Sequence, residues 1–168
     1  MPIAQALLPE FDNEMATTRR LLARVPEDRA SWKPHPKSTE LGGLAVHVAN
    51  LVGLAVRAVH ETGVNFNPPG GPPFSPPRFT TTAALLEMFD ANVAKGREAI
   101  AGASDEDLMV PWTLQSGDHV IFTLPRAAVL RNMVMNHIIH HRGQLSVYLR
   151  ENDVPLPSIY GPTADESM

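Results

Sequence analysis

A proline-rich segment between two helical stretches constrains the fold more than any other feature of the sequence. Residues 63–79, GVNFNPPGGPPFSPPRF, contain six prolines, which lack the amide hydrogen that a helix interior requires. Such a segment runs largely extended at roughly 3.1 Å per residue, so it can travel the ~30 Å length of a 20-residue helix. A connection that returns to its starting end makes the two flanking helices parallel, which a tight turn would not allow.

Apolar residues recur at helical spacing in four stretches of the chain. The stretches are residues 3–25, 39–60, 81–101 and 125–151. Pro9 predicts a kink or a separate first turn in the first stretch, and Ser38 or Thr39 is the expected N-cap of the second. The expected core face of the third stretch consists of Leu85, Met88, Phe89, Val93 and Ile100. Pro125 suits the first turn of the fourth stretch.

A short turn signal lies before the last helical stretch. The letters SGD stand between runs of alternating character within residues 107–125, which predicts a small hairpin arm. Together these patterns predict an all-α protein whose residues 1–168 form one domain, a four-helix bundle with a long crossover.

Composition excludes several classes of protein. The chain has 168 residues, a net charge of -4 and no cysteine, and it contains no run of lysine or arginine. We therefore expect no nucleic-acid partner and no thiolate metal site. No segment approaches the roughly 20 uninterrupted apolar residues of a membrane span, and the N-terminus lacks the basic lead of a signal peptide. We expect a soluble cytoplasmic protein in which nitrogen and oxygen atoms hold any metal.

The stretch NHIIHHRGQ, residues 136–144, concentrates the candidate functional side chains. At ~100° per residue, His137, His141, Gln144 and Tyr148 fall on one stripe of the helix, together with Leu130 and Val134, and we expect this stripe to face the core. On the same wheel His140 lies on the shoulder of the stripe and Arg142 points outward. Met135, Ile138 and Ile139 form a second apolar strip, to be covered by residues 102–124 or by another chain.

Two imidazoles one turn apart can offer two nitrogens to one ion at about 2.0–2.1 Å. His47, in GGLAVHVANL, shares a stripe with three leucines and is the candidate third ligand. A hydrogen-bonded core histidine is the alternative for each of these residues, because an HxxxH pair without an intervening glutamate is only moderately specific. The residues alone leave both interpretations open.

Four segments carry a family resemblance. The chain resembles the DinB/YfiT-like family of metal-dependent proteins over about residues 21–166. The resemblance rests on the segments HIIHHRGQLSVYLR, LGGLAVHVANL, VPEDRASWKPHPKS and the closing VPLPSIYGPTADE. The resemblance implies an up-down-down-up four-helix bundle, a homodimer, and a divalent metal ion, zinc or nickel, bound by His47, His137 and His141. Relatives in that family include S-transferases and an isomerase that use low-molecular-weight thiols such as bacillithiol or mycothiol.

Three neutral ligands leave an ion with an open position, where the pKa of a water can fall toward ~7 or a thiol can be held as thiolate. We therefore expect a metal-dependent enzyme that transfers a small thiol to an electrophilic small molecule. Hydrolysis ranks second, because it needs a carboxylate base and none lies within a turn of His137 or His141. A non-catalytic metal- or ligand-binding bundle is the third hypothesis, and Asp165 or Glu166 would close its site.

Three further residues are candidates for supporting roles around this site. Gln144 can hydrogen-bond a substrate or a ligand imidazole, Tyr148 can do the same or simply pack, and His140 is expected as a neighbour of the metal rather than a ligand.

Overall fold

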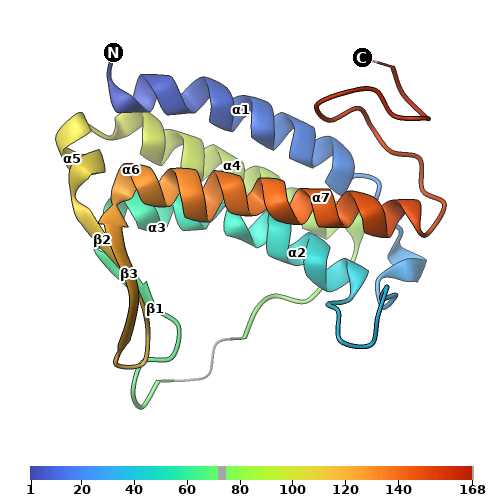
Figure 1. Cartoon of the computed structure of the whole chain (residues 1–168), viewed down its shortest axis with the longest axis horizontal. Helices are drawn as coiled ribbons and strands as arrows, with labels where there is room; N and C mark the ends of the chain where they lie inside the picture. Colours follow the sequence, from blue (N-terminus) through green and yellow to red (C-terminus); the bar gives the residue numbers. More distant parts are fainter. Residues whose placement is uncertain (72–74, 168) are drawn as a thin grey trace.

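The computed structural model describes residues 1–71 and 75–167, which form a mostly helical fold with a small three-stranded sheet (Figure 1). The middle of the predicted proline-rich crossing, residues 72–74, lies outside the described residues. The helical elements are α1 (Ile3–Leu22), the 3₁₀ turn η1 (Glu27–Arg29), α2 (Leu41–Leu51), α3 (Leu54–His60), α4 (Thr82–Gly102), α5 (Asp105–Met109), α6 (Arg126–Val129), the π-helical segment η2 (Leu130–Asn136) and α7 (His137–Arg150). The strands are β1 (Gly63–Asn65), β2 (Pro111–Ser116) and β3 (His119–Pro125).

The long helices lie side by side in Figure 1, with α2, α3 and α4 running in one direction and α1 and α7 in the other. Helix α1 packs against α4 and α7, and α2 packs against α4 and α7. Their apolar faces meet in one core, whose largest fully buried side chains include Phe11, Leu21, Phe89, Ile100, Leu130 and Ile138. Burial of this apolar surface is the main force holding the helices together.

Helix α1 continues through Pro9 to Leu22, so the predicted separate first turn is absent. Pro9 is exposed, and so is Gln5, whose carbonyl lacks the amide partner that residue 9 would otherwise provide.

The second predicted helix is divided into α2 and α3. The amide of Gly53 donates to the carbonyl of Asn50 at 3.0 Å, which leaves the carbonyl of Ala49 without its helical partner. The side chain of Asn92, on α4, donates to that carbonyl at 3.1 Å. The N-cap of α2 is Glu40, without a side-chain cap, so the prediction of Ser38 or Thr39 was wrong.

Residues Leu41–His60 are apolar and long enough, by length and composition, to cross a membrane, unlike the expectation from the sequence. In the fold, 61% of the most apolar window of this stretch is buried. The core of the protein therefore accounts for its apolar character.

The predicted hairpin is confirmed as β2 and β3, joined at Gly117 and Asp118, with Gly117 at φ +61° as a tight two-residue turn requires. Strand β1, which was not predicted, pairs parallel with β2. A Cβ at Gly63 would lie 2.3 Å from the carbonyl oxygen of Thr113, so glycine permits this close pairing. The fold is therefore mostly helical, as predicted, and its sheet has one strand more than the predicted hairpin.

The last helical segment changes its winding along its length. The π-helical segment η2 contains one residue more per turn than an α-helix, which shifts the helical register between α6 and α7. The buried residues of α7 are Ile138, Arg142, Leu145 and Leu149. The prediction that the histidine stripe faces the core was therefore wrong. The stripe lies beside the buried one.

The same shift overturns two further predictions. Arg142 is 1% exposed rather than outward-pointing, and it forms an ion pair with the buried Glu14 of α1 at 2.7 Å. Met135 and Ile138 are buried within the single chain, and Ile139 is partly buried. A second chain is therefore not needed to cover Met135 and Ile138.

Candidate metal centre

The structure brings together the three histidines that the sequence singled out. His47 lies on α2, and His137 and His141 lie one turn apart on α7, which packs beside α2. One ring nitrogen from each residue lies within 4.8 Å of the others. The ring centroids are 4.6 Å apart for His47 and His141, 5.3 Å for His47 and His137, and 4.7 Å for His137 and His141. Three imidazoles at this spacing can hold one metal ion.

Burial favours the uncharged forms of His47 and His137. The pKa of His47 is lowered from 6.5 to about 4, first by burial and then by the nearby His141 and His137. Burial also lowers the pKa of His137, and His141 has a smaller effect in the same direction. A hydrogen bond from the His137 ring to the backbone of Met133 acts against them. Neutral imidazoles keep the lone pairs that a metal ligand needs, so the donor set fits a divalent ion.

Gln144 fixes the orientation of one of these rings. Its Oε1 lies 2.7 Å from Nδ1 of His141. Because a carbonyl oxygen can only accept, Nδ1 carries the proton and Nε2 keeps the lone pair. Tyr148 packs edge-on against Trp32 at 5.5 Å. His140 is exposed, with its ring 4.9 Å from that of His141, and it does not belong to the three-histidine group.

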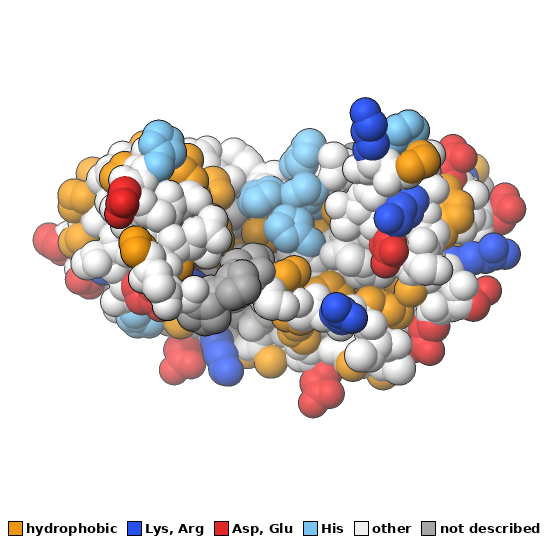
Figure 2. All heavy atoms as spheres, turned by 90° about the horizontal axis from the view of Figure 1, so that it is seen from below, with side chains coloured by type: hydrophobic (Ala, Val, Ile, Leu, Met, Phe, Trp, Pro, Cys, Tyr) orange, Lys and Arg blue, Asp and Glu red, His pale blue; other side chains and the backbone are white. Residues whose placement is uncertain are grey.

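The histidines line a cleft of about 940 Å³ between α2, α7 and the segment after β1. Figure 2 shows a group of histidine side chains in a hollow of this face. Its wall comprises Lys37, Ser38, Thr39, Gly43, Leu44, Val46, Asn50, Leu51, Gly53, Leu54, Arg57, Val64, Phe66, Pro76, Pro77, Met133, Gln144 and Tyr148. The described wall therefore contains no carboxylate. A second cleft of about 680 Å³ lies elsewhere, around His60, Lys95 and Arg126, and does not include the histidine group.

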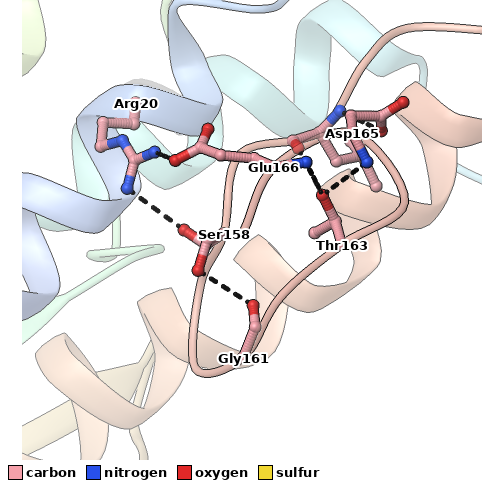
Figure 3. A network of polar contacts seen from close by, with 7 residues as sticks. Arg20, Ser158, Gly161, Thr163, Asp165 and Glu166 are labelled. Atoms are coloured by element: carbon pink, nitrogen blue, oxygen red, sulfur yellow. Dashed lines mark hydrogen bonds and ion pairs between the residues drawn. The ribbon is translucent and has the colours of Figure 1, made fainter. Parts of the chain in front are cut away.

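The carboxylates considered as a fourth ligand are engaged in other contacts (Figure 3). Glu166 forms an ion pair with Arg20. Asp165 pairs with Arg150 and accepts from the backbone amide of Leu156 at 2.9 Å. Neither tail carboxylate belongs to the group that can hold the ion.

Sequence reasoning missed several residues of the cleft. Phe66, Pro76 and Pro77 belong to the proline-rich crossing, whose path depends on the unpredicted pairing of β1 with β2. Lys37 and Asn50 lie in segments that carry the family resemblance, but neither residue type by itself indicates a place in the cleft. Their only signal is position, since Asn50 follows His47 by three residues on the same helix and therefore shares its side.

The comparisons with known proteins agree with this geometry. The profile of the DinB superfamily matches residues 10–145, which is most of the chain. The protein therefore belongs to the DinB superfamily.

Individual similarities extend over nearly the whole chain. The protein is 24% identical to the uncharacterized protein YrdA of Bacillus subtilis strain 168, over 95% of this chain and 89% of the relative. A crystal structure of a DinB-like protein from Bacillus cereus ATCC 10987 is similar with a TM-score of 0.70 and 22% identity, covering 93% of this chain and 97% of that one. The DinB-like YjoA of B. subtilis is similar with a TM-score of 0.66 and 20% identity, covering 97% and 99%. At these identities the similarity establishes a shared fold.

Proposed function

We propose that this DinB-superfamily protein is a metal-dependent enzyme that transfers a low-molecular-weight thiol to an electrophilic small molecule. One observation carries the proposal: ring nitrogens of three histidines converge within 4.8 Å on the wall of a cleft of about 940 Å³. Zinc and nickel are the ions expected for an all-nitrogen donor set. A cleft of this size suits a small-molecule substrate.

Different residues of the cleft would have different roles in such a reaction. A divalent ion held by the three histidines would supply a Lewis acid that favours the ionised form of a thiol. Gln144 holds His141 in the tautomer whose Nε2 is free. The apolar residues of the wall, among them Leu51, Leu54 and Phe66, exclude water and so favour attack on the electrophile over hydrolysis.

Hydrolysis is the second candidate function. A metal-dependent hydrolase gains much of its rate from a carboxylate placed as general base, whereas the described wall of the cleft contains neither aspartate nor glutamate. This composition favours thiol transfer.

A non-catalytic binding bundle is the third candidate. It is disfavoured by the contacts of Asp165 and Glu166, which hold the tail to Arg150 and Arg20 rather than serving as a fourth ligand.

We further propose an up-down-down-up four-helix bundle, a homodimer and a cytoplasmic location, following the family resemblance. The exposed Val120 and Ile121 on the edge strand β3 support self-association, because an unpaired apolar strand edge favours pairing with another chain. Sedimentation of the purified protein measures the oligomeric state.

Elemental analysis of protein purified without a metal-affinity column tests the metal centre. We expect about one zinc or nickel ion per chain in the wild type and less than a tenth of that in His47→Ala, because two ligands on one helix bind far more weakly than three. His140→Ala is the matched control, since His140 is exposed and outside the group, and it should retain the ion. Equal metal contents in wild type and His47→Ala would refute the centre.

A panel of thiols with a generic electrophile then tests the reaction. Turnover that requires both the thiol and the metal supports transfer. Hydrolysis of simple esters or amides without a thiol would favour the second candidate instead.

A further inference from the structure

The charged residues that line the cleft are of one sign. Lys37 and Arg57 are the only charged side chains in the described wall apart from the histidines. Arg57 is compensated by Glu61, four residues on, through contacts of 2.9 and 3.0 Å. Lys37 has no carboxylate within ion-pair distance in the described part of the chain, whereas the nearby Lys33 lies 3.8 Å from Glu40. One uncompensated cation therefore borders the cleft.

Polar side chains gather near this cation. Lys37, Ser38 and Thr39 precede α2, whose first turn is tied to the loop by the bond from the Leu41 amide to the Trp32 carbonyl, 2.9 Å long. Tyr148 packs on the same Trp32. Because α7 runs antiparallel to α2 (Figure 1), Gln144 and Tyr148 lie on this side of the histidines. This end of the cleft offers an ammonium, hydroxyls and an amide, but no carboxylate.

The opposite end of the cleft is mostly apolar, and its charged side chain, Arg57 on α3, is paired with Glu61. Beyond the histidines the wall is formed by Leu54 on α3, by Val64 and Phe66 of the segment containing β1, and by Met133 of η2. Figure 1 places β1 and the start of α2 toward opposite ends of the molecule. The candidate metal centre thus lies between a polar end with an uncompensated cation and a mostly apolar end whose one cation, Arg57, is paired.

We infer that the cleft binds a small amphiphilic carboxylic acid, with its carboxylate at Lys37 and its apolar body along Phe66 and Leu54. This inference deepens the proposed function, since it takes the same cleft as the substrate site. A carboxylate accepts charge-assisted hydrogen bonds from an ammonium and from hydroxyls, and the apolar body removes exposed hydrophobic surface from water. The acid group belongs either to the thiol or to the electrophile.

Equilibrium binding tests the inference without requiring any turnover. Metal-free full-length protein at pH 8 is titrated calorimetrically with 4-phenylbutyrate, 4-phenyl-1-butanol and 4-phenylbutylamine, which share one apolar body. We expect the acid to bind about five- to tenfold more tightly than the alcohol, as for one charge-assisted contact, and the amine to bind most weakly. Parallel titrations with 3-mercaptopropionate and 2-mercaptoethanol show whether the preference for an acid extends to the thiol.

Two variants test the contribution of each end of the cleft to binding. Lys37→Gln should abolish the preference for acid over alcohol, whereas Lys33→Gln, outside the cleft, should retain it. Phe66→Ala should weaken the binding of the phenylbutyl acid and of the phenylbutyl alcohol by the same factor. Equal binding of acid and alcohol in both compound series, an unchanged preference in Lys37→Gln, or no binding of any compound would each overturn the inference. Because no metal or reaction is involved, failure of thiol transfer in its own assay leaves this result unaffected.

Discussion

His47 shows how strongly its surroundings alter the protonation of one side chain. Its pKa falls from 6.5 to about 4 on folding, mainly through burial. Between these two values the unfolded chain binds a proton that folded His47 does not, so the free energy of unfolding of the metal-free protein decreases as the pH falls through this window. We expect His47→Gln to show a smaller loss of stability between pH 7 and pH 5. Urea denaturation in chelator at both pH values measures the difference, and equal losses in both proteins would contradict the prediction.

The group of three histidines that could hold an ion was predicted from the sequence, because spacing along a helix determines which side chains share a face. His137 and His141 are four positions apart, and His47 lies on the same face of its helix as nearby leucines. Arg142 could not be placed correctly, because nothing in the residue types of 130–136 announces a π-helical turn. Lys37 could not be assigned to the cleft, since its role depends on contacts between distant segments.

The buried ion pair of Arg142 and Glu14 supports a second prediction. Glu14 also accepts from the hydroxyl of Tyr160 at 2.8 Å, and Arg142 also donates to Thr18 Oγ1 at 3.1 Å. Arg142→Ala would leave a buried carboxylate without its cation, which costs about 3–5 kcal/mol. We expect chemical denaturation to show a loss of this size.

An exposed pair provides the matched control for this substitution. Arg97 contacts Asp12 at 2.8 Å, but both side chains are roughly half exposed. Arg97→Ala should therefore cost only about 0–1 kcal/mol, because water screens such pairs. Similar losses in the two variants would show that the Arg142 pair contributes no more than a surface contact.

At the level of elements, the π-helical segment η2 allows a deletion that ordinary helices do not tolerate. Removing one residue from a π-helical turn restores a continuous α-helix while both flanks keep their register. Asn132 is exposed within η2, so we expect its deletion to preserve the metal content of the protein and to change the melting temperature by only a few degrees. Elemental analysis and thermal denaturation measure the two quantities.

The corresponding deletion in α7 should have a different outcome. Gly143 is exposed in regular helix, and its removal rotates the residues that follow by ~100°. Leu145 and Leu149 would then leave the core, and we expect the variant to unfold. Loss of metal in the Asn132 deletion would show instead that η2 itself shapes the centre.

The elements differed in how far they could be predicted. Helix α4 follows its prediction within a residue at each end, because Thr81 caps it, accepting from the Ala84 amide at 3.1 Å, and its apolar spacing is regular. Strand β1 was missed because it has only three residues and pairs with a strand about fifty residues away. The division at Gly53 depends on Asn92 of another helix. Local patterns predict local structure, whereas tertiary contacts decided these two features.

At the scale of the whole molecule, the metal centre should stabilise the fold. An ion that binds only the folded state adds about 2.7 kcal/mol to the free energy of unfolding at a concentration a hundred times its Kd. For a chain of this length that corresponds to a rise of roughly 5–10 °C in melting temperature. We expect a chelator to remove this increment from the wild type and to leave the melting temperature of His47→Ala nearly unchanged.

The distance along the chain between His47 and His137 has a consequence for how the protein acquires its metal. Ninety positions separate the first candidate ligand from the second, and the third follows four positions later. During synthesis, the growing polypeptide carries at most one of these imidazoles until α7 is made. An ion held by all three would therefore bind only after α7 has emerged, so its identity would depend on the folded domain and on the free metal around it.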